Sequence, residues 1–517
     1  MKPLFARACG MIAFAVLSLV PASMASAANP LDEAVSAALS SRGAALAEPC
    51  TDEVFVRRVY LDLLGTFPRP KEAEAFLRSR DPDKRAALVR ELFLREEYAD
   101  YWSLRWGDVL RIKSEFPINL WPNAVQAYHR WIHQALRENM SWDRFARALL
   151  TTSGSNFRDP PVNFYRAVAA RDPASLAKAA ALTFLGTRLE SWPAEVQADL
   201  AAFFSRVAWK RTLEWKEEIV YSNPSAAGEL RTRLPDGRAV VVAEGADPRP
   251  IFADWLTGPE NPWFVRALVN RVWYWLLGTG ITEPADAIPW GGGGRPADAG
   301  AGEGVMRILE REFRASGCDL RSLLALILTS RTYQQSSLLQ PEDTPAELAF
   351  ARYAIRRLDA EIIADALTWL GGVGPGYSSP IPEPFTYVPD SQPTIALSDG
   401  SITSPFLVRF GRPSRDTGLL SERSNQPSEE QALYLLNSSE VRRRIEASPV
   451  LKPLYNMPKA QRSEQVRRIY FVLLDRLPTA EELELVAAHA AATGDAAQAA
   501  RDLAWVLVNS KEFLYRH

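Results

Sequence analysis

Four arginines stand close together in the last third of this sequence, where their side chains could bind an anion. They are Arg409, Arg412, Arg415 and Arg423. A guanidinium group stays charged at neutral pH and pairs with a carboxylate, sulfate or phosphate through two parallel hydrogen bonds. Four such groups within fifteen positions predict a binding site for an anionic ligand, and Glu383 adds a carboxylate from the same long segment.

The arginines have a structural alternative, because acidic residues are interspersed with them. These are Asp399, Asp416, Glu422 and Glu429. Ion pairs with these acids would hold a long loop together instead of binding a ligand. An enzyme is a further alternative, since paired carboxylates in an open cleft beside the arginines would favour a hydrolase. The sequence leaves these alternatives open.

Two other groups of polar residues suggest chemistry less strongly. His129 and His133 are four positions apart on a predicted helix, a spacing that can hold zinc, but the Glu of the hydrolytic motif is missing. We therefore predict structural or solvent-facing histidines and no metal site. Asp359 and Glu361 stand at a predicted helix start, where acidic side chains favour capping.

Tryptophans are concentrated in one stretch of the first half of the chain. They are Trp102, Trp106, Trp121, Trp131 and Trp142. Exposed tryptophans stack on sugars or bases, whereas buried ones fill a core. Trp102 and Trp106 share one face of a helix, so the core interpretation is favoured.

The composition excludes several classes of protein. The chain has 517 residues, 47% of them hydrophobic, and a formal net charge of −2. This is the composition of a globular protein, and the missing basic excess argues against nucleic acid as a partner. Four His and three Cys are too few for a metal protein rich in these residues. We expect no cofactor.

Residues 1–27 are predicted to be a signal peptide. A positively charged start precedes a short apolar stretch from residue 11 to 20, and Ala25-Ser26-Ala27 fits a cleavage site. An uncleaved anchor is the alternative, although the apolar stretch is too short to span a bilayer. The prediction is a secreted or periplasmic protein, cleaved after Ala27, with no integral membrane segment left.

Two cysteines remain in the predicted mature chain, Cys50 and Cys318. An oxidising compartment would allow them to form one disulfide. Two isolated cysteines so far apart in sequence are more often unpaired, and both states stay open.

An amphipathic helical pattern recurs three times. It spans residues 56–64, 269–277 and 466–474, with apolar residues at i, i+3, i+4, i+7 and i+8. A second amphipathic segment follows each, near residues 88–98, 323–333 and 503–513. We predict a helix–turn–helix unit used three times. Gly65 and Gly278 suit the left-handed position after a helix end.

The predicted fold is mostly α, with two helical domains of repeated helix–turn–helix units and a small β-containing connecting segment. The expected bounds are 28–215 for the first domain, 216–250 for the connection and 251–517 for the second domain. Asp236-Gly237 predicts a β-hairpin within residues 231–242. Residues 371–428 have no helical period but several apolar anchors, so an ordered long loop is expected.

Longer motifs add a family resemblance. The first set comprises residues 58–65, Pro68, Tyr98, Trp102, Trp106, Arg111 and residues 142–145. The second comprises residues 261–262, 269–273, 277–280, 328–336, 356–361, 410–413, 422–423 and 435–437. Together they resemble the paired domains of unknown function 1549 and 1553 of exported bacterial proteins of the planctomycete and verrucomicrobial type. This family has no settled activity, so the resemblance implies the domain pairing and export only.

The chain departs from that family at two places. Many relatives carry Cys-x-x-Cys-His, a haem attachment pattern, where this chain has Glu190-Ser191-Trp192-Pro193. Relatives often also carry Cys-x-Cys where this chain has residues 418–421. The chain is therefore expected to be a variant that lacks the haem motif, and a role as a redox partner is the least favoured.

The leading hypothesis is an exported non-haem binding or accessory protein. Its expected partner is an anionic extracellular polysaccharide or a co-exported protein. The alternative is a hydrolase acting on such a polysaccharide.

Overall fold

The computed structural model describes residues 29–517 except 42, 292–300, 339–349 and 375. The predicted signal peptide lies outside these described residues. Helices dominate the chain and strands are few and short, which confirms the mostly α fold class. Within the described residues no helix is long and apolar enough to cross a membrane.

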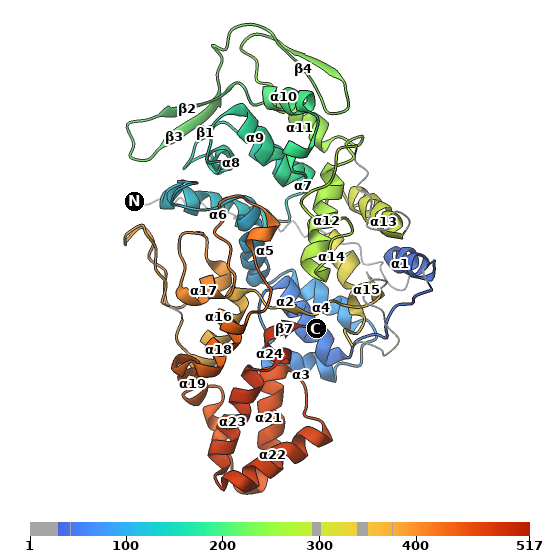
Figure 1. Cartoon of the computed structure of the whole chain (residues 1–517), viewed down its shortest axis with the longest axis vertical. Helices are drawn as coiled ribbons and strands as arrows, with labels where there is room; N and C mark the ends of the chain where they lie inside the picture. Colours follow the sequence, from blue (N-terminus) through green and yellow to red (C-terminus); the bar gives the residue numbers. More distant parts are fainter. Residues whose placement is uncertain (1–28, 42, 292–300, 339–349, 375) are drawn as a thin grey trace, which may run out of the picture.

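The helices before residue 210 lie across the middle and in the upper part of Figure 1. They are α1 (Pro30–Ser40), α2 (Asp52–Leu63), α3 (Pro70–Arg78), α4 (Lys84–Leu92), α5 (Glu96–Val109), α6 (Pro122–Arg137), α7 (Trp142–Thr151), α8 (Asn163–Arg166), α9 (Pro173–Ala180) and α10 (Ala194–Ala202). Short turns of helix are η1 (Pro160–Val162), the π-helical η2 (Ala181–Leu185) and η3 (Leu189–Ser191).

The later helices run from the upper part of the molecule to its lower end (Figure 1). They are α11 (Arg249–Thr257), α12 (Phe264–Leu277), α13 (Ala301–Ala315), α14 (Leu320–Leu328), α15 (Arg331–Gln334), α16 (Ala360–Gly371), α17 (Pro405–Arg409), α18 (Glu429–Asn437), α19 (Ser439–Glu446), α20 (Lys452–Tyr455), α21 (Arg462–Leu474), α22 (Ala480–Thr493), α23 (Ala496–Val508) and α24 (Lys511–Leu514). Short 3-10 turns are η5 (Thr394–Ala396), η6 (Leu420–Glu422) and η7 (Lys459–Gln461).

The strands form small antiparallel sheets. They are β1 (Gly154–Ser155), β2 (Val207–Arg211), β3 (Glu218–Ser222), β4 (Leu230–Arg233), β5 (Ala239–Val242), β6 (Arg356–Arg357) and β7 (Tyr515–Arg516). The hairpin β4–β5 pairs Leu230 with Val242 around Gly237, which confirms the predicted hairpin. The sheet in the order β1-β3-β2 was not predicted, and two of its strands lie before residue 216.

The recurring helices lie where the sequence predicts them. The first helices of the three units are α2, α12 and α21, and the second are α4, α14 and α23. Gly65 and Gly278 adopt positive φ angles of 65° and 87°, which confirms the predicted helix ends. Each unit also has an arginine two positions before its aromatic residue, and this arginine makes different contacts in the three units. Arg58 and Arg271 are buried and donate to backbone carbonyls, whereas Arg468 pairs with Glu464 at the surface.

Segments from the start and the end of the chain meet near the middle of the molecule (Figure 1). Strand β7 pairs with β6, so Arg516 lies opposite Arg356. Arg57 of α2 donates to Asp475 after α21 over 2.8 Å. The first and third helical units therefore contact each other directly, and the last residues of the chain reach its interior.

The long segment 371–428 packs against the rest of the chain mainly between residues 394 and 415, where most of its buried residues lie. Ile395 and Phe410 are buried, and Asp365 of α16 accepts hydrogen bonds from the backbone of η5. Two other aromatic residues of the segment, Phe385 and Tyr387, are exposed. The segment also contains the short elements η5, α17 and η6.

The tryptophan and cysteine predictions have clear outcomes. Trp102 and Trp106 are fully buried and pack on Trp275, which confirms the core interpretation for this pair. Cys50 and Cys318 are free thiols. The structure thus favours the unpaired state of the two cysteines.

The two candidate zinc histidines of α6 have separate environments. His129 is buried and its Nε2 has no hydrogen-bond partner among the described residues, whereas His133 lies 3.1 Å from Asp100. Across the described part of the chain, no group of three or more His, Cys, Asp or Glu is placed to hold a metal ion. Burial, together with the charges of Arg415 and His133, lowers the pKa of His129 to about 3.

This histidine should make the protein less stable in mild acid. Below pH 6.5 the unfolded chain protonates His129 and the folded chain does not, so stability falls as the pH falls toward 3. Between pH 6.5 and pH 5 the loss is about 2 kcal/mol. We expect His129→Gln to reduce the change in melting temperature between pH 7 and pH 5. His489→Gln, at an exposed histidine, is the control, and equal slopes in the two variants would contradict the prediction.

Candidate functional site

Three of the four predicted arginines come together in the interior. Arg412, Arg415 and Arg423 converge on Asp108 of α5 and Glu361 of α16. Arg409 lies apart and pairs with Glu430 near the surface over 2.8 Å. Glu383 also lies apart: it is exposed and lines a separate hollow within the long segment. The structure thus brings together three of the five predicted residues.

The prediction of which acidic residues pair with these arginines is wrong. Arg412 donates to the backbone carbonyl of Asp399, while the Asp399 carboxylate accepts from Ser114 and Ser401. Asp416 pairs with Lys113 instead. The real partners are distant in sequence, because the long segment packs against α5 and α16 and its acids face other groups.

Arg423 occupies the centre of this arrangement. Its Nε donates to Asp108 over 2.9 Å, and its two Nη atoms donate to the two oxygens of Glu361 over 2.7 and 3.0 Å. Burial alone would lower the pKa of Arg423, but the charges of Asp108, Glu361 and Asp359 outweigh it and hold that pKa well above its usual value. Arg415 shares Asp108 through a bond of 2.9 Å.

A second carboxylate, Asp359, joins the N-terminal and C-terminal parts of the chain. Its Oδ2 accepts from Arg105, from Tyr101 and from Arg516, at 2.8 to 3.0 Å. Its Oδ1 accepts from Asn425 over 2.7 Å. Burial would raise the pKa of Asp359, but the three arginines around it hold that pKa well below its usual value.

Asp359 stands at the predicted helix start, but its side chain does not cap the helix as predicted. Asp359 is the N-cap residue of α16, but its side chain makes no cap hydrogen bond. The carboxylate turns instead to the arginines, which offer stronger charge-assisted bonds. Glu361 stands in the first turn of α16 and is likewise committed to Arg423.

These groups form one buried set, which we call the ion cluster. Its carboxylates are Asp62, Asp108, Asp359 and Glu361, and its arginines are Arg105, Arg356, Arg357, Arg412, Arg415, Arg423 and Arg516. Seven arginines against four carboxylates leave a formal excess of three positive charges. Burying unpaired positive charge is costly, so an arginine excess favours a bound anion.

A pocket of about 420 Å³ opens beside the ion cluster, and we call it the central pocket. Its charged lining residues are Arg105, Asp108, Arg356, Arg357 and Arg423. Helices α5 and α12, strands β6 and β7 and the segment 419–427 supply its walls. The remaining polar lining includes Tyr274, Ser421, Ser424, Gln426 and Tyr515.

Several donors on these arginines have no hydrogen-bond partner within the described residues. Arg356 Nε and Arg357 Nε are buried and unpartnered. Arg105 donates through Nε and Nη2 and leaves Nη1 without a bond. Arg357 binds only backbone carbonyls, and burial lowers its pKa. The two Nε atoms are not accessible from the pocket, so the pocket combines incompletely neutralised charge with one donor, Arg105 Nη1, that has no partner within the described residues.

The carboxylates at the pocket are all committed to arginines. Asp108 is the sole acidic residue in its described lining, and both of its oxygens accept from arginine. Among the described residues its lining contains no His or Cys. Most glycoside hydrolases use two free carboxyl groups, and the described lining of this pocket does not offer such a pair.

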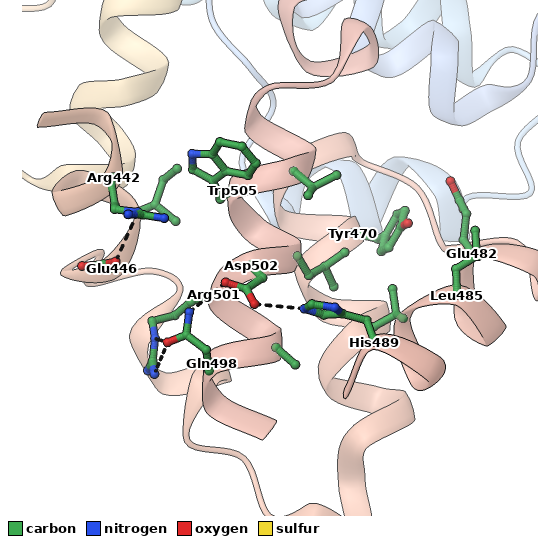
Figure 2. A pocket seen from close by; sticks show the side chains of 15 residues that line it. Arg442, Glu446, Tyr470, Glu482, Leu485, His489, Gln498, Arg501, Asp502 and Trp505 are labelled. Atoms are coloured by element: carbon green, nitrogen blue, oxygen red, sulfur yellow. Dashed lines mark hydrogen bonds and ion pairs between the residues drawn. The ribbon is translucent and has the colours of Figure 1, made fainter. Parts of the chain in front are cut away.

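A larger hollow lies between the C-terminal helices, as Figure 2 shows. It measures about 620 Å³ and is lined by α19, α21, α22 and α23. His489 of α22 points toward Asp502 of α23 at 2.9 Å, with Tyr470 and Trp505 nearby (Figure 2). Thr493 places its Oγ1 3.5 Å from His489 Nε2, but this hydroxyl donates to the His489 backbone carbonyl and Thr493 does not line the hollow. None of the predicted site residues lies there.

Four residues of the ion cluster were not predicted from the sequence. Asp62, Arg105 and Asp108 lie on helices whose neighbouring residues are mostly apolar, and a charged residue within such an apolar stretch is the signal that could have indicated a buried ion pair. Arg516 stands one position before His517, and nothing in its neighbourhood predicts a buried role. Its contact with Asp62 arises from the pairing of β6 with β7.

The fold and the pocket define a mostly α-helical protein whose N-terminal and C-terminal parts share one arginine-rich site. Residues 30–191 match the family described as Protein of unknown function (DUF1549), and residues 248–490 match the family described as Protein of unknown function (DUF1553). The chain therefore pairs these two domains, as the motifs predicted. The central pocket takes lining residues from both matched segments. Neither a curated protein nor a solved structure matches the chain.

Proposed function

We propose that this protein is an exported, non-haem binding or accessory protein that holds an anionic group in the central pocket. The observation that carries the proposal is the excess of arginine over carboxylate in the wall of that pocket, together with the Nη1 donor of Arg105, which has no partner within the described residues. The ligand class that fits is a carboxylate or sulfate group of an extracellular polysaccharide. The signal-peptide pattern supports the exported location, and the missing Cys-x-x-Cys-His supports a role without haem.

The pocket's place between two parts of the chain supports this proposal further. We divide the chain into a first domain at 28–215, a connection at 216–250 and a second domain at 251–517. Arg105 and Asp108 come from the first domain, and Arg356, Arg357 and Arg423 come from the second. A ligand bound there would contact both domains and stabilise their association.

The proposal predicts specific binding of small anions. Sulfate and glucuronate should raise the melting temperature of the protein above the effect of sodium chloride at equal ionic strength, and glucose should not. Arg105→Gln removes the donor without a partner, and a charge-assisted hydrogen bond contributes about 1.5–3 kcal/mol. We therefore expect calorimetry at 20 °C to show affinity weakened by roughly ten- to a hundredfold.

The matched control is Arg468→Gln, which removes an exposed arginine that pairs with Glu464. This variant should bind as the wild type does. Arg105 also donates to Asp359, so circular dichroism must first show that Arg105→Gln is folded. The proposal fails if neither anion binds the wild type, or if folded Arg105→Gln binds with unchanged affinity.

A further inference from the structure

We propose that a second site, an aromatic platform on the surface, binds the sugar rings of an acidic polysaccharide. The platform consists of Trp121, Trp215 and Phe385, and Lys216 stands beside it. The three rings come from the start of α6, the turn between β2 and β3, and the long segment 371–428. These elements approach one another at the left edge of Figure 1.

Of the three rings, Trp121 is the inner one, and Trp215 and Phe385 are the outer ones. Trp121 is half-buried and lies 5.0 Å from Trp215 at 83°, and 5.5 Å from Phe385. Trp215 and Phe385 are 5.7 Å apart, with 57% and 39% of their surfaces exposed. Trp121 therefore braces the two outer rings, whose open faces can stack on a ligand.

The backbone at the platform adopts conformations that bulky side chains rarely tolerate. Trp121 has φ +73° and ψ +146°, and Lys216 has φ +62°. Strain of this kind persists where surrounding structure enforces it, and it gathers at functional sites. Trp121 is half-buried and Lys216 is exposed, so core packing does not account for this strain.

The polar groups around the rings favour a sugar over a lipid surface. The Lys216 ammonium lies 4.4 Å from the centre of the Trp121 ring and 5.8 Å from that of Trp215, and no carboxylate pairs with it among the described residues. The Arg158–Glu214 ion pair is exposed on the same turn. Aromatic faces flanked by hydrogen-bonding groups suit pyranose rings, which have both apolar faces and hydroxyls. The free ammonium suits a sugar acid.

The platform is distinct from the central pocket, since the two share no residue. Its test uses immobilised polygalacturonate, uncharged dextran and phospholipid vesicles with a net negative charge, all in saturating sulfate to occupy the central pocket. We expect the wild type to bind polygalacturonate. Trp215→Ala and Phe385→Ala should each weaken this binding by about tenfold, and Trp215→Tyr should retain most of it.

Leu213→Ala is the matched control, because Leu213 is fully exposed on the same turn and has no ring. It should bind as the wild type does. Lys216→Ala should weaken binding of polygalacturonate toward the level seen with dextran. The proposal is overturned if Trp215→Ala and Phe385→Ala bind polygalacturonate normally. It is also overturned if the wild type binds vesicles and not polysaccharide, or if Leu213→Ala loses binding as the ring variants do.

Discussion

Asp359→Ala is expected to destabilise the folded protein by about 3–5 kcal/mol. The carboxylate of Asp359 is fully buried and accepts from Tyr101, Arg105, Arg516 and Asn425. Removing it leaves Arg105 with no carboxylate partner and Arg516 with Asp62 alone. Uncompensated buried charge accounts for most of the cost. Urea unfolding at pH 7, followed by circular dichroism, measures the effect.

Two further variants test whether the loss of stability comes from the buried charge of Asp359. Glu464→Ala removes an exposed carboxylate that pairs with Arg468, and exposed pairs contribute only about 0–1 kcal/mol. Asp359→Asn keeps the shape and one acceptor oxygen while removing the charge, so we expect a loss between those of the other two variants. If Asp359→Ala unfolds at the same urea concentration as Glu464→Ala, the ion cluster does not stabilise the fold as argued.

Local patterns in the sequence predicted the helices because a helix depends on nearby residues. The stripe in residues 269–277 and the glycine at 278 define the end of α12 without knowledge of the rest of the chain. The β4–β5 hairpin is equally local, since Asp236-Gly237 specifies its turn. The pairing of β1 with β3 could not be predicted from the sequence. A strand of two residues has no recognisable period, and its partner is more than sixty positions away.

The sequence predicted the positive charge of the candidate site, but it did not predict which carboxylates pair with the arginines. The spacing of the late arginines predicted that Arg409, Arg412, Arg415 and Arg423 act together. Three of them converge on Asp108 and Glu361, Arg409 lies apart, and only Arg423 lines the central pocket. Their carboxylates, Asp108 and Glu361, lie on helices far from them in sequence, where local spacing carries no information. Only the packing of the long segment against α5 and α16 brings these groups into one cluster.

Gly65→Ala is the second substitution with a large expected effect on stability. Gly65 ends α2 with φ +65°, a conformation that costs an L-residue about 1–2 kcal/mol. An added Cβ would also lie 2.4 Å from the Tyr101 ring, which is buried and must shift. Overpacking of this kind costs about 1–3 kcal/mol, so we expect a total of about 3 kcal/mol in urea unfolding.

A matched glycine isolates the contribution of the crowded ring. Gly494 ends α22 with φ +71°, and nothing lies within 4 Å of a Cβ added there. Gly494→Ala should therefore show the backbone cost alone, and equal losses in the two variants would refute the proposed clash. Tyr101 also donates to Asp359, so its displacement should weaken the ion cluster. Combining Gly65→Ala with Tyr101→Ala removes the clashing ring, and the double variant should lose less stability than the sum of the two single variants.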